Sequence, residues 1–324
     1  MKKTIALLAG TAFSLAFATS AFAEKWDMPV AYPASNFHTE NAVAFTKCVA
    51  DGTKGALEIV VHANGSLFAG NDIKRAVQTG QAPIGERLLS AHANENPLFA
   101  VDSIPFLASS FDASDKLWAA AIDKVSAALE AQDLVYVYSV AWPPQGLYTK
   151  KEVNSAADLK GVKFRAYNAA TARIAELAGM VPVQIEAAEL SQALATGVAD
   201  SFISSGSTGV DSKVWESLKY FYDVQAWLPR NVIFVNKGVY DGLDDASKKV
   251  VMDCGAKAAE TGEATSRELT AKYLKELAEN GMIVGDPGEQ LKSDFEGFGA
   301  TMTEEWLAKA GPDGKAIIDA YKAN

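Results

Sequence analysis

The chain has 324 residues and is acidic, because 40 Asp and Glu outnumber 30 Lys and Arg and give a formal net charge of −10. A negative surface argues against nucleic acid and anionic lipid as partners, although a local binding site can still be positive. The length is more than one hydrophobic core usually holds, so two lobes are expected.

The N-terminus has the features of a secretory signal peptide. The positive pair Lys2-Lys3 precedes an uncharged, apolar run over residues 5–22, and Ala21-Phe22-Ala23 is a small-x-small cleavage site. Removing residues 1–23 takes away two positive charges and leaves −10 − 2 = −12. We therefore predict a periplasmic protein that begins near Glu24. The shortness of the run and its cleavage site disfavour the alternative of a membrane anchor.

The first half of the mature chain alternates short apolar runs with stretches of helical periodicity. The predicted strands are 26–31, 57–61 and 134–141, and the predicted helices are 41–51, 71–79 and 115–132. Asn36 or Thr39 is the predicted cap of the first helix. Pro143-Pro144 ends the third strand, and we place the first crossing between the lobes just after it.

The second half continues the alternation and returns to the first lobe. Strands are predicted at 162–167, 200–203 and 233–235, with a helix at 171–178. Residues 246–280 contain no proline and predict one long helix, or two with a break near Gly255 or Gly262. The order implies an α/β fold of two lobes with a hinge. The expected first lobe is 24–147 plus about 234–275, and the second is 148–233 plus about 276–324.

Catalytic and metal-binding motifs are absent from the sequence. It has no Gly-x-Ser-x-Gly elbow, no His-Glu-x-x-His, no Walker loop and no Gly-x-Gly-x-x-Gly. His38, His62 and His92 show no metal-ligand spacing, so no enzyme activity, cofactor or metal is predicted. Cys48 and Cys254 are the two cysteines, and one disulfide or two buried thiols are both compatible with the sequence.

Five segments in a fixed order cover nearly the whole mature chain. They are LEIVVH followed by GSL (57–67), IPFL (104–107), DLKGVKFR (158–165), ALATGVAD (193–200) and VNKGVY (235–240). Together they resemble the solute-binding proteins of tripartite ATP-independent periplasmic (TRAP) transporters, of the dicarboxylate-binding-protein (DctP) type. The resemblance implies two α/β lobes with a ligand cleft, a long helix bridging both lobes, a carboxylate ligand, and delivery to a permease driven by an ion gradient.

Arg165 is the principal candidate for binding a carboxylate. Alternation along residues 162–167 places Lys163, Arg165 and Tyr167 on one face of the strand. Arg165 lies near the carboxyl end of that strand, where open α/β sheets bind ligands, and its planar guanidinium matches a carboxylate. From the residues alone, an ion pair with a surface acid is the alternative. The resemblance places the family's carboxylate-binding arginine at this position.

Two positions depart from the family's pattern. Ser204 stands where an asparagine is frequent, and its hydroxyl has a shorter reach. Trp142-Pro143-Pro144-Gln145 stands where many members have a second arginine, so a second carboxylate on the ligand is in doubt. Gln145 could supply a neutral hydrogen bond. Trp142 could pack on an apolar or ring-bearing ligand, or equally belong to the core under the hinge.

Weaker candidates come from other loops near the expected cleft. Arg87 follows a strand end of the first lobe, although an ion pair with Glu86 or another neighbour is the simpler interpretation. Tyr167 shares the face of Arg165, and Asn168 follows it in the same loop. The remaining candidates are residues that ordinary packing could also explain or that lie near the return crossing: Phe37, Trp227, Arg230 and Asn231.

The sequence thus predicts an extracytoplasmic receptor that binds a small organic acid between two lobes and delivers it to the permease subunits of a TRAP-type transporter. A monomer is expected, and the missing second arginine leans toward a monocarboxylate. The alternatives are a secreted hydrolase or isomerase of small acids, and a receptor for an ATP-driven importer or a sensor. The sequence does not name the acid.

Overall fold

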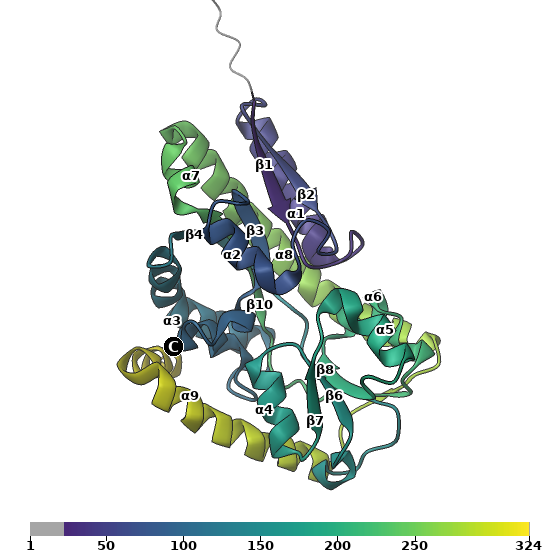
Figure 1. The fold of residues 1–324 in the computed structure, drawn as a ribbon. Coiled ribbons are helices and arrows are strands. Elements are labelled where there is room, and N and C mark those ends of the chain that lie inside the picture. The colour runs from purple at the N-terminus through teal and green to yellow at the C-terminus, as the bar shows by residue number, and fades with distance from the viewer. Residues whose placement is uncertain (1–22, 324) are drawn as a thin grey trace, which may run out of the picture.

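The computed structural model describes residues 23–323, which form two lobes connected by extended segments and helices (Figure 1). The segment predicted as a signal peptide lies outside this range except for its last residue, Ala23. Within the described range, no helix combines the length and the apolar character that a membrane span requires. The two-lobed α/β architecture predicted from the sequence is confirmed.

The first lobe contains two small sheets flanked by helices. Its strands are β1 (Glu24–Pro29), β2 (Leu57–His62), β3 (Ile84–Leu88), β4 (Leu134–Ala141) and β10 (Arg230–Asn236). β1 pairs in parallel with β2 and contacts β3, while β10 pairs antiparallel with β3 and β4. Its helices are α1 (Phe37–Gly52), α2 (Ile73–Gln78), α3 (Phe111–Glu130) and α7 (Lys237–Gly242). The return of β10 between β3 and β4 makes this lobe discontinuous in sequence.

The second lobe is built on a six-stranded sheet in the order β11-β9-β5-β8-β6-β7. Its strands are β5 (Gly146–Thr149), β6 (Lys163–Ala166), β7 (Val181–Gln184), β8 (Ser201–Ser204), β9 (Tyr220–Tyr222) and β11 (Ile283–Gly285). Its helices are α4 (Ala169–Leu177), α5 (Leu190–Ala195) and α6 (Gly206–Asp211). Because β6 runs parallel to both β7 and β8, the carboxyl ends of these three strands lie at the same edge of the sheet.

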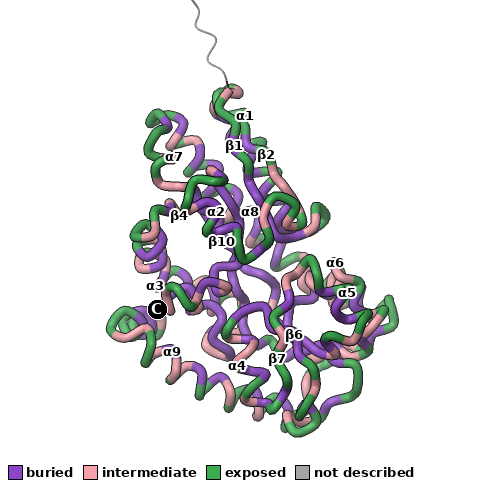
Figure 2. The backbone as a smooth tube through the Cα atoms, viewed as in Figure 1, coloured by how far each residue is buried: buried purple, intermediate pink, exposed green. Residues whose placement is uncertain are grey.

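Two extended segments cross between the lobes side by side. Residues 142–145 lead out of β4 and residues 226–229 lead into β10. Trp142 N donates to the Pro229 carbonyl oxygen at 2.8 Å, and Gln145 N donates to the Trp227 carbonyl oxygen at 3.0 Å. Figure 2 shows buried backbone continuing through this region, so the crossing belongs to the core. Such paired, short connections are typical of a hinge.

Two long helices also bridge the lobes. α8 (Asp245–Glu279) is continuous, which confirms the single-helix alternative, and it packs on α1 and β4 of the first lobe and on α6 of the second. A Cβ at Gly262 would lie 2.5 Å from Val140 Cγ2, so this glycine permits the close approach of α8 to β4. α9 (Glu289–Ala323) contacts α3 and α4 and is kinked at Gly311.

A disulfide between Cys48 of α1 and Cys254 of α8 decides between the two predicted states of the cysteines. It ties the first half of α8 to the first lobe.

The first helix begins at Phe37, four residues before the expected start, because Asn36 is its cap and accepts a hydrogen bond from His38 N. Strands β5, β7, β9 and β11 were not predicted, since three or four residues are too few to establish a periodic pattern.

Candidate functional site

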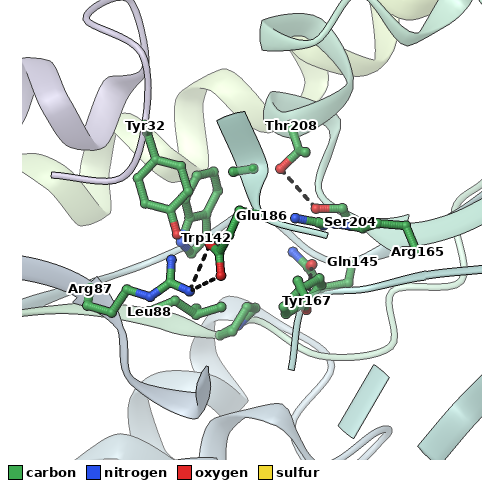
Figure 3. Close-up of a pocket in the computed structure, with 12 residues that line it drawn as sticks. Tyr32, Arg87, Leu88, Trp142, Gln145, Arg165, Tyr167, Glu186, Ser204 and Thr208 are labelled. Carbon is green, nitrogen blue, oxygen red and sulfur yellow. Dashed lines mark hydrogen bonds and ion pairs between the residues drawn. The ribbon is translucent and has the colours of Figure 1, made fainter. Parts of the chain in front are cut away.

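A pocket lies between the lobes at the carboxyl ends of β6, β7 and β8 (Figure 3). The space between its walls is about 410 Å³, a figure that includes the solvent at its mouth. Residues of both lobes and of the crossing segments line it: Tyr32, Arg87, Leu88, Trp142, Gln145, Arg165, Tyr167, Glu186, Ala187, Ser204, Thr208 and Pro229. Its position follows from the topology, because ligands of open α/β sheets bind beyond the carboxyl ends of the strands.

Arg165 is the third of the four residues of β6, and it presents its guanidinium to this pocket. Its Nε donates to the Ile185 carbonyl oxygen at 2.9 Å, and no group among residues 23–323 accepts a hydrogen bond from its two terminal nitrogens. The guanidinium carbon lies 5.1 Å from the centre of the Tyr167 ring. Burial lowers the pKa of Arg165 to about 10, which leaves the side chain charged at neutral pH. A buried cation of this kind attracts an anion from solution.

Tyr32 and Trp142 form an aromatic wall on another side of the pocket. Their ring centres are 4.8 Å apart in an edge-on arrangement. Trp142 Nε1 donates to Asn231 Oδ1 at 2.8 Å, and the Tyr32 hydroxyl donates to the same oxygen at 3.4 Å. Asn231 donates in turn to the buried carboxyl of Glu86. Burial raises the pKa of Tyr32 to about 12, so the wall is neutral and is held by a polar network beneath it.

Neutral polar side chains complete the pocket. The Tyr167 hydroxyl donates to Gln145 Oε1 at 3.1 Å, and Gln145 Nε2 donates to the Pro143 carbonyl oxygen at 2.9 Å. The Ser204 hydroxyl donates to Thr208 Oγ1 at 2.9 Å. Burial raises the pKa of Tyr167, which therefore stays protonated. These bonds orient the groups before any ligand arrives.

Side-chain contacts cross the cleft and hold the lobes together. They include Arg87 Nη2 to Glu186 Oε2 at 3.1 Å, Asn36 Nδ2 to Asp211 Oδ2 at 2.6 Å and to Ser207 Oγ at 3.3 Å, and Asn168 Nδ2 to Ser90 Oγ at 2.9 Å. In each pair one residue belongs to the first lobe and the other to the second. The structure is therefore in a closed arrangement.

Arg87 lies within β3 and not after a strand end, and it does not pair with Glu86, the neighbour that the sequence suggested. Successive side chains of β3 point to opposite faces, so Glu86 faces Asn231 while Arg87 faces the cleft. There Arg87 Nη2 donates to Asn71 Oδ1 at 2.7 Å and to the Glu186 carboxylate. The ion pair is thus formed between the lobes and not on the surface of one of them.

Six of the nine ligand-binding candidates line the pocket, namely Arg165, Trp142, Gln145, Ser204, Tyr167 and Arg87. The other three lie outside the lining. Phe37 packs edge-on against Trp142 behind the aromatic wall. Asn168 caps α4, and its amide group is already engaged with Ser90. Trp227 is fully buried in the crossing segment, where it fills the core.

Arg230, a further candidate, is a hinge residue and does not line the pocket. It is buried at the start of β10 and forms ion pairs with Glu263 of α8 and Asp115 of α3. Glu263 also accepts a hydrogen bond from the backbone N of Ala141 at 2.9 Å. Glu263 therefore connects α8 to the last residue of β4 and the first residue of β10, where the two crossing segments begin and end. Asn231 takes part indirectly, through the aromatic wall that it supports.

Sequence reasoning missed several lining residues, of which Tyr32, Glu186 and Thr208 carry polar groups. Tyr32 follows the first strand and Glu186 follows β7, so both stand just beyond the carboxyl end of a strand. The rule that selected Arg165 would have selected Glu186 too, had the four residues of β7 been recognised as a strand. Residues 23–323 contain no group of three His, Cys, Asp or Glu side chains arranged to hold a metal ion.

Comparison with known proteins gives a family match and close structural relatives. The family model for bacterial extracellular solute-binding proteins, family 7, matches residues 30–309. A TRAP solute-binding protein from an unidentified marine microbe, solved with co-purified pyroglutamate, is 55% identical, with a TM-score of 0.92 and coverage of 93% of this chain and 99% of that chain. Two Bordetella pertussis extracytoplasmic solute receptors that bind pyroglutamic acid, DctP6 and DctP7, are 48% and 45% identical, each with a TM-score of 0.92 and coverage of 93% and 100%.

Proposed function

The chain belongs to bacterial extracellular solute-binding protein family 7, and we propose that its inter-lobe pocket binds pyroglutamate. The family consists of receptors for small solutes, and the three relatives of 45–55% identity bind this acid. The observation that carries the proposal is the guanidinium of Arg165, which faces the pocket without a protein acceptor for its terminal nitrogens among residues 23–323.

The chemistry of pyroglutamate corresponds to the groups that line the pocket. The ligand is a lactam ring with one carboxylate, one carbonyl acceptor and one N–H donor. Arg165 binds the carboxylate through its two terminal nitrogens. Tyr32 and Trp142 contact the apolar part of the ring. Gln145 and Ser204 offer neutral donors and acceptors for the lactam.

Ligand binding stabilises the closed arrangement of the lobes. The carboxylate binds Arg165 of the second lobe, while Arg87 and Tyr32 of the first lobe approach from the other side. Contacts to the first lobe exist only when the cleft is closed, so the ligand shifts the population toward closure. The closed, loaded protein then passes its ligand to the permease subunits of a TRAP transporter.

We place the mature protein in the periplasm as a monomer, exported through the signal peptide that ends before Glu24. The disulfide between Cys48 and Cys254 supports this, because disulfides persist in oxidising compartments and are rare in the cytosol.

Calorimetric titration of the purified mature protein tests the ligand. Pyroglutamate should bind with a Kd of about 1 μM or tighter. Pyrrolidinone, which has the lactam ring and no carboxylate, should not bind measurably, because it cannot neutralise Arg165. Absence of binding by pyroglutamate, or equal binding of both compounds, would rule the proposal out.

A further inference from the structure

The pocket is lined by three charged side chains, Arg87, Arg165 and Glu186, and by nine neutral residues. The two guanidiniums and the carboxylate give a formal charge of 2 − 1 = +1. The cations are not equivalent. Arg87 is paired with Glu186, whereas none of residues 23–323 accepts a hydrogen bond from the terminal nitrogens of Arg165. One positive charge is therefore left for a ligand.

The pair between Arg87 and Glu186 is built into the closed cleft. Its side chains are 4% and 20% exposed, so neither charge is well solvated. A Cβ at Gly70 would lie 2.6 Å from Glu186 Oε2 and 2.7 Å from Arg87 Nη1, so the pair occupies the space that any larger residue would need. Asn71 holds Arg87 from the side by accepting from Nη2 at 2.7 Å. Both contacts are made by Nη2, so Glu186 and Asn71 together fix the direction of the Arg87 side chain.

The neighbouring acid of the first lobe does not disturb this charge balance. Glu86 is buried on the opposite face of β3, where it accepts a hydrogen bond from Asn231 and faces His38 at 3.8 Å. It does not line the pocket. Glu186 is thus the acid that a ligand in the pocket would meet.

We propose that Glu186 is a specificity-determining residue that restricts this pocket to monoanions and excludes dicarboxylates. The inference rests on the proposed function of the same pocket as a carboxylate site. A single carboxylate neutralises the unpaired charge of Arg165. A second carboxylate on the same ligand would have to compete with Glu186 for Arg87. If it displaced Glu186, that acid would be left unpaired in a poorly solvated space, which is unfavourable. Specificity then comes from a repulsive element as well as an attractive one.

The test is Glu186→Gln, which keeps a side-chain acceptor for Arg87 and removes the negative charge. Wild type and variant are titrated calorimetrically with glutarate and with pentanoate, five-carbon acids with two carboxylates and one. In Glu186→Gln, the pocket charge becomes +2, so glutarate should bind at least about tenfold tighter than it binds wild type. Pentanoate should change by less than about threefold, because it needs Arg165 alone.

Control variants separate the role of Arg87 from a general effect of net charge. The double variant Arg87→Gln with Glu186→Gln should lose the gain for glutarate, because the released cation is gone. Glu189→Gln removes the same charge from an exposed position three residues away and should leave both affinities unchanged. Thermal melting of each protein checks folding. Glu186→Ala should repeat the gain for glutarate and serves as the second test if the Gln variant is unstable.

An unchanged or weaker affinity for glutarate in folded Glu186→Gln or Glu186→Ala would overturn the proposal. So would an equal gain in Glu189→Gln, because the effect would then be a general one of net charge. Failure of wild type to bind pyroglutamate would refute the proposed ligand instead, and it would leave the comparison of glutarate with pentanoate valid as a test of Glu186.

Discussion

Replacing Arg165 by Met removes the charge that anchors the proposed ligand and keeps an unbranched side chain of similar length. Arg165 Nε is engaged by the Ile185 carbonyl at 2.9 Å, which leaves two terminal nitrogens for the carboxylate. Hydrogen bonds to charged groups contribute about 1.5–3 kcal/mol each, so two of them contribute about 3–6 kcal/mol. At about 1.4 kcal/mol per tenfold change in Kd, Arg165→Met should weaken pyroglutamate binding by about 10²- to 10⁴-fold.

Arg165→Lys separates charge from geometry. The lysine ammonium keeps the charge but lacks the planar, forked set of N–H donors. It cannot donate to the Ile185 carbonyl oxygen and to both carboxylate oxygens in the directions that the guanidinium does. The Arg165→Lys variant should therefore lose one good hydrogen bond to the ligand, which corresponds to about 10- to 100-fold weaker binding of pyroglutamate. The variants should therefore rank wild type, Lys, Met in order of decreasing affinity.

Isothermal titration calorimetry with pyroglutamate measures the series, with higher protein and ligand concentrations for the weaker variants. Arg173→Met is the matched control, because Arg173 lies on α4 of the same lobe and pairs with Glu305 at 2.8 Å outside the pocket. Circular dichroism and thermal melting confirm that each variant folds. A folded Arg165→Met that binds within about threefold of wild type would refute the assignment of Arg165 as the carboxylate anchor.

Two further predictions concern stability. Burial raises the pKa of Glu86 from 4.5 to about 7, so the native state holds a proton that the unfolded chain has already lost, and the free energy of unfolding falls as pH rises through this window. At about 1.4 kcal/mol per pH unit, the raised pKa lowers the unfolding free energy of wild type at high pH by about 3 kcal/mol. Glu86→Gln can still accept a hydrogen bond from Asn231 and carries no titrating group. The variant should therefore be more stable than wild type at pH 8 by up to that amount, and equally stable near pH 4. Urea denaturation at both pH values measures this, and parallel pH profiles of the two proteins would contradict it. The disulfide spans 206 residues, so replacing Cys48 and Cys254 by Ser should cost about 2–5 kcal/mol in unfolding free energy. Denaturation of oxidised, reduced and double-Ser protein checks this, and equal midpoints would show that α1 and α8 are held by packing alone.

The sequence was informative wherever structure depends on residues close together in the chain. Alternation along residues 162–167 was enough to place Arg165 on one face near a strand end, and the structure has it there. The proline-free stretch after residue 245 predicted the long helix α8. Local patterns failed for β7, whose four residues include Pro182, and Glu186 was missed with it. Asn168 was placed in the loop correctly, but its amide serves as a helix cap and an inter-lobe contact.

Only the tertiary structure decided which distant groups meet. Arg87 and Glu186 are 99 residues apart and belong to different lobes, and neither local pattern contains information about the other. Their pairing depends on how the lobes close, which is determined jointly by the crossing segments, the two bridging helices and the contacts across the cleft. Backbone periodicity tells which way a side chain points from its own strand, because that is a property of a few consecutive dihedral angles. Which partner it finds depends on the packing of the whole chain, and for that reason the direction of the Arg165 side chain could be predicted from the sequence while the charge balance around it could not.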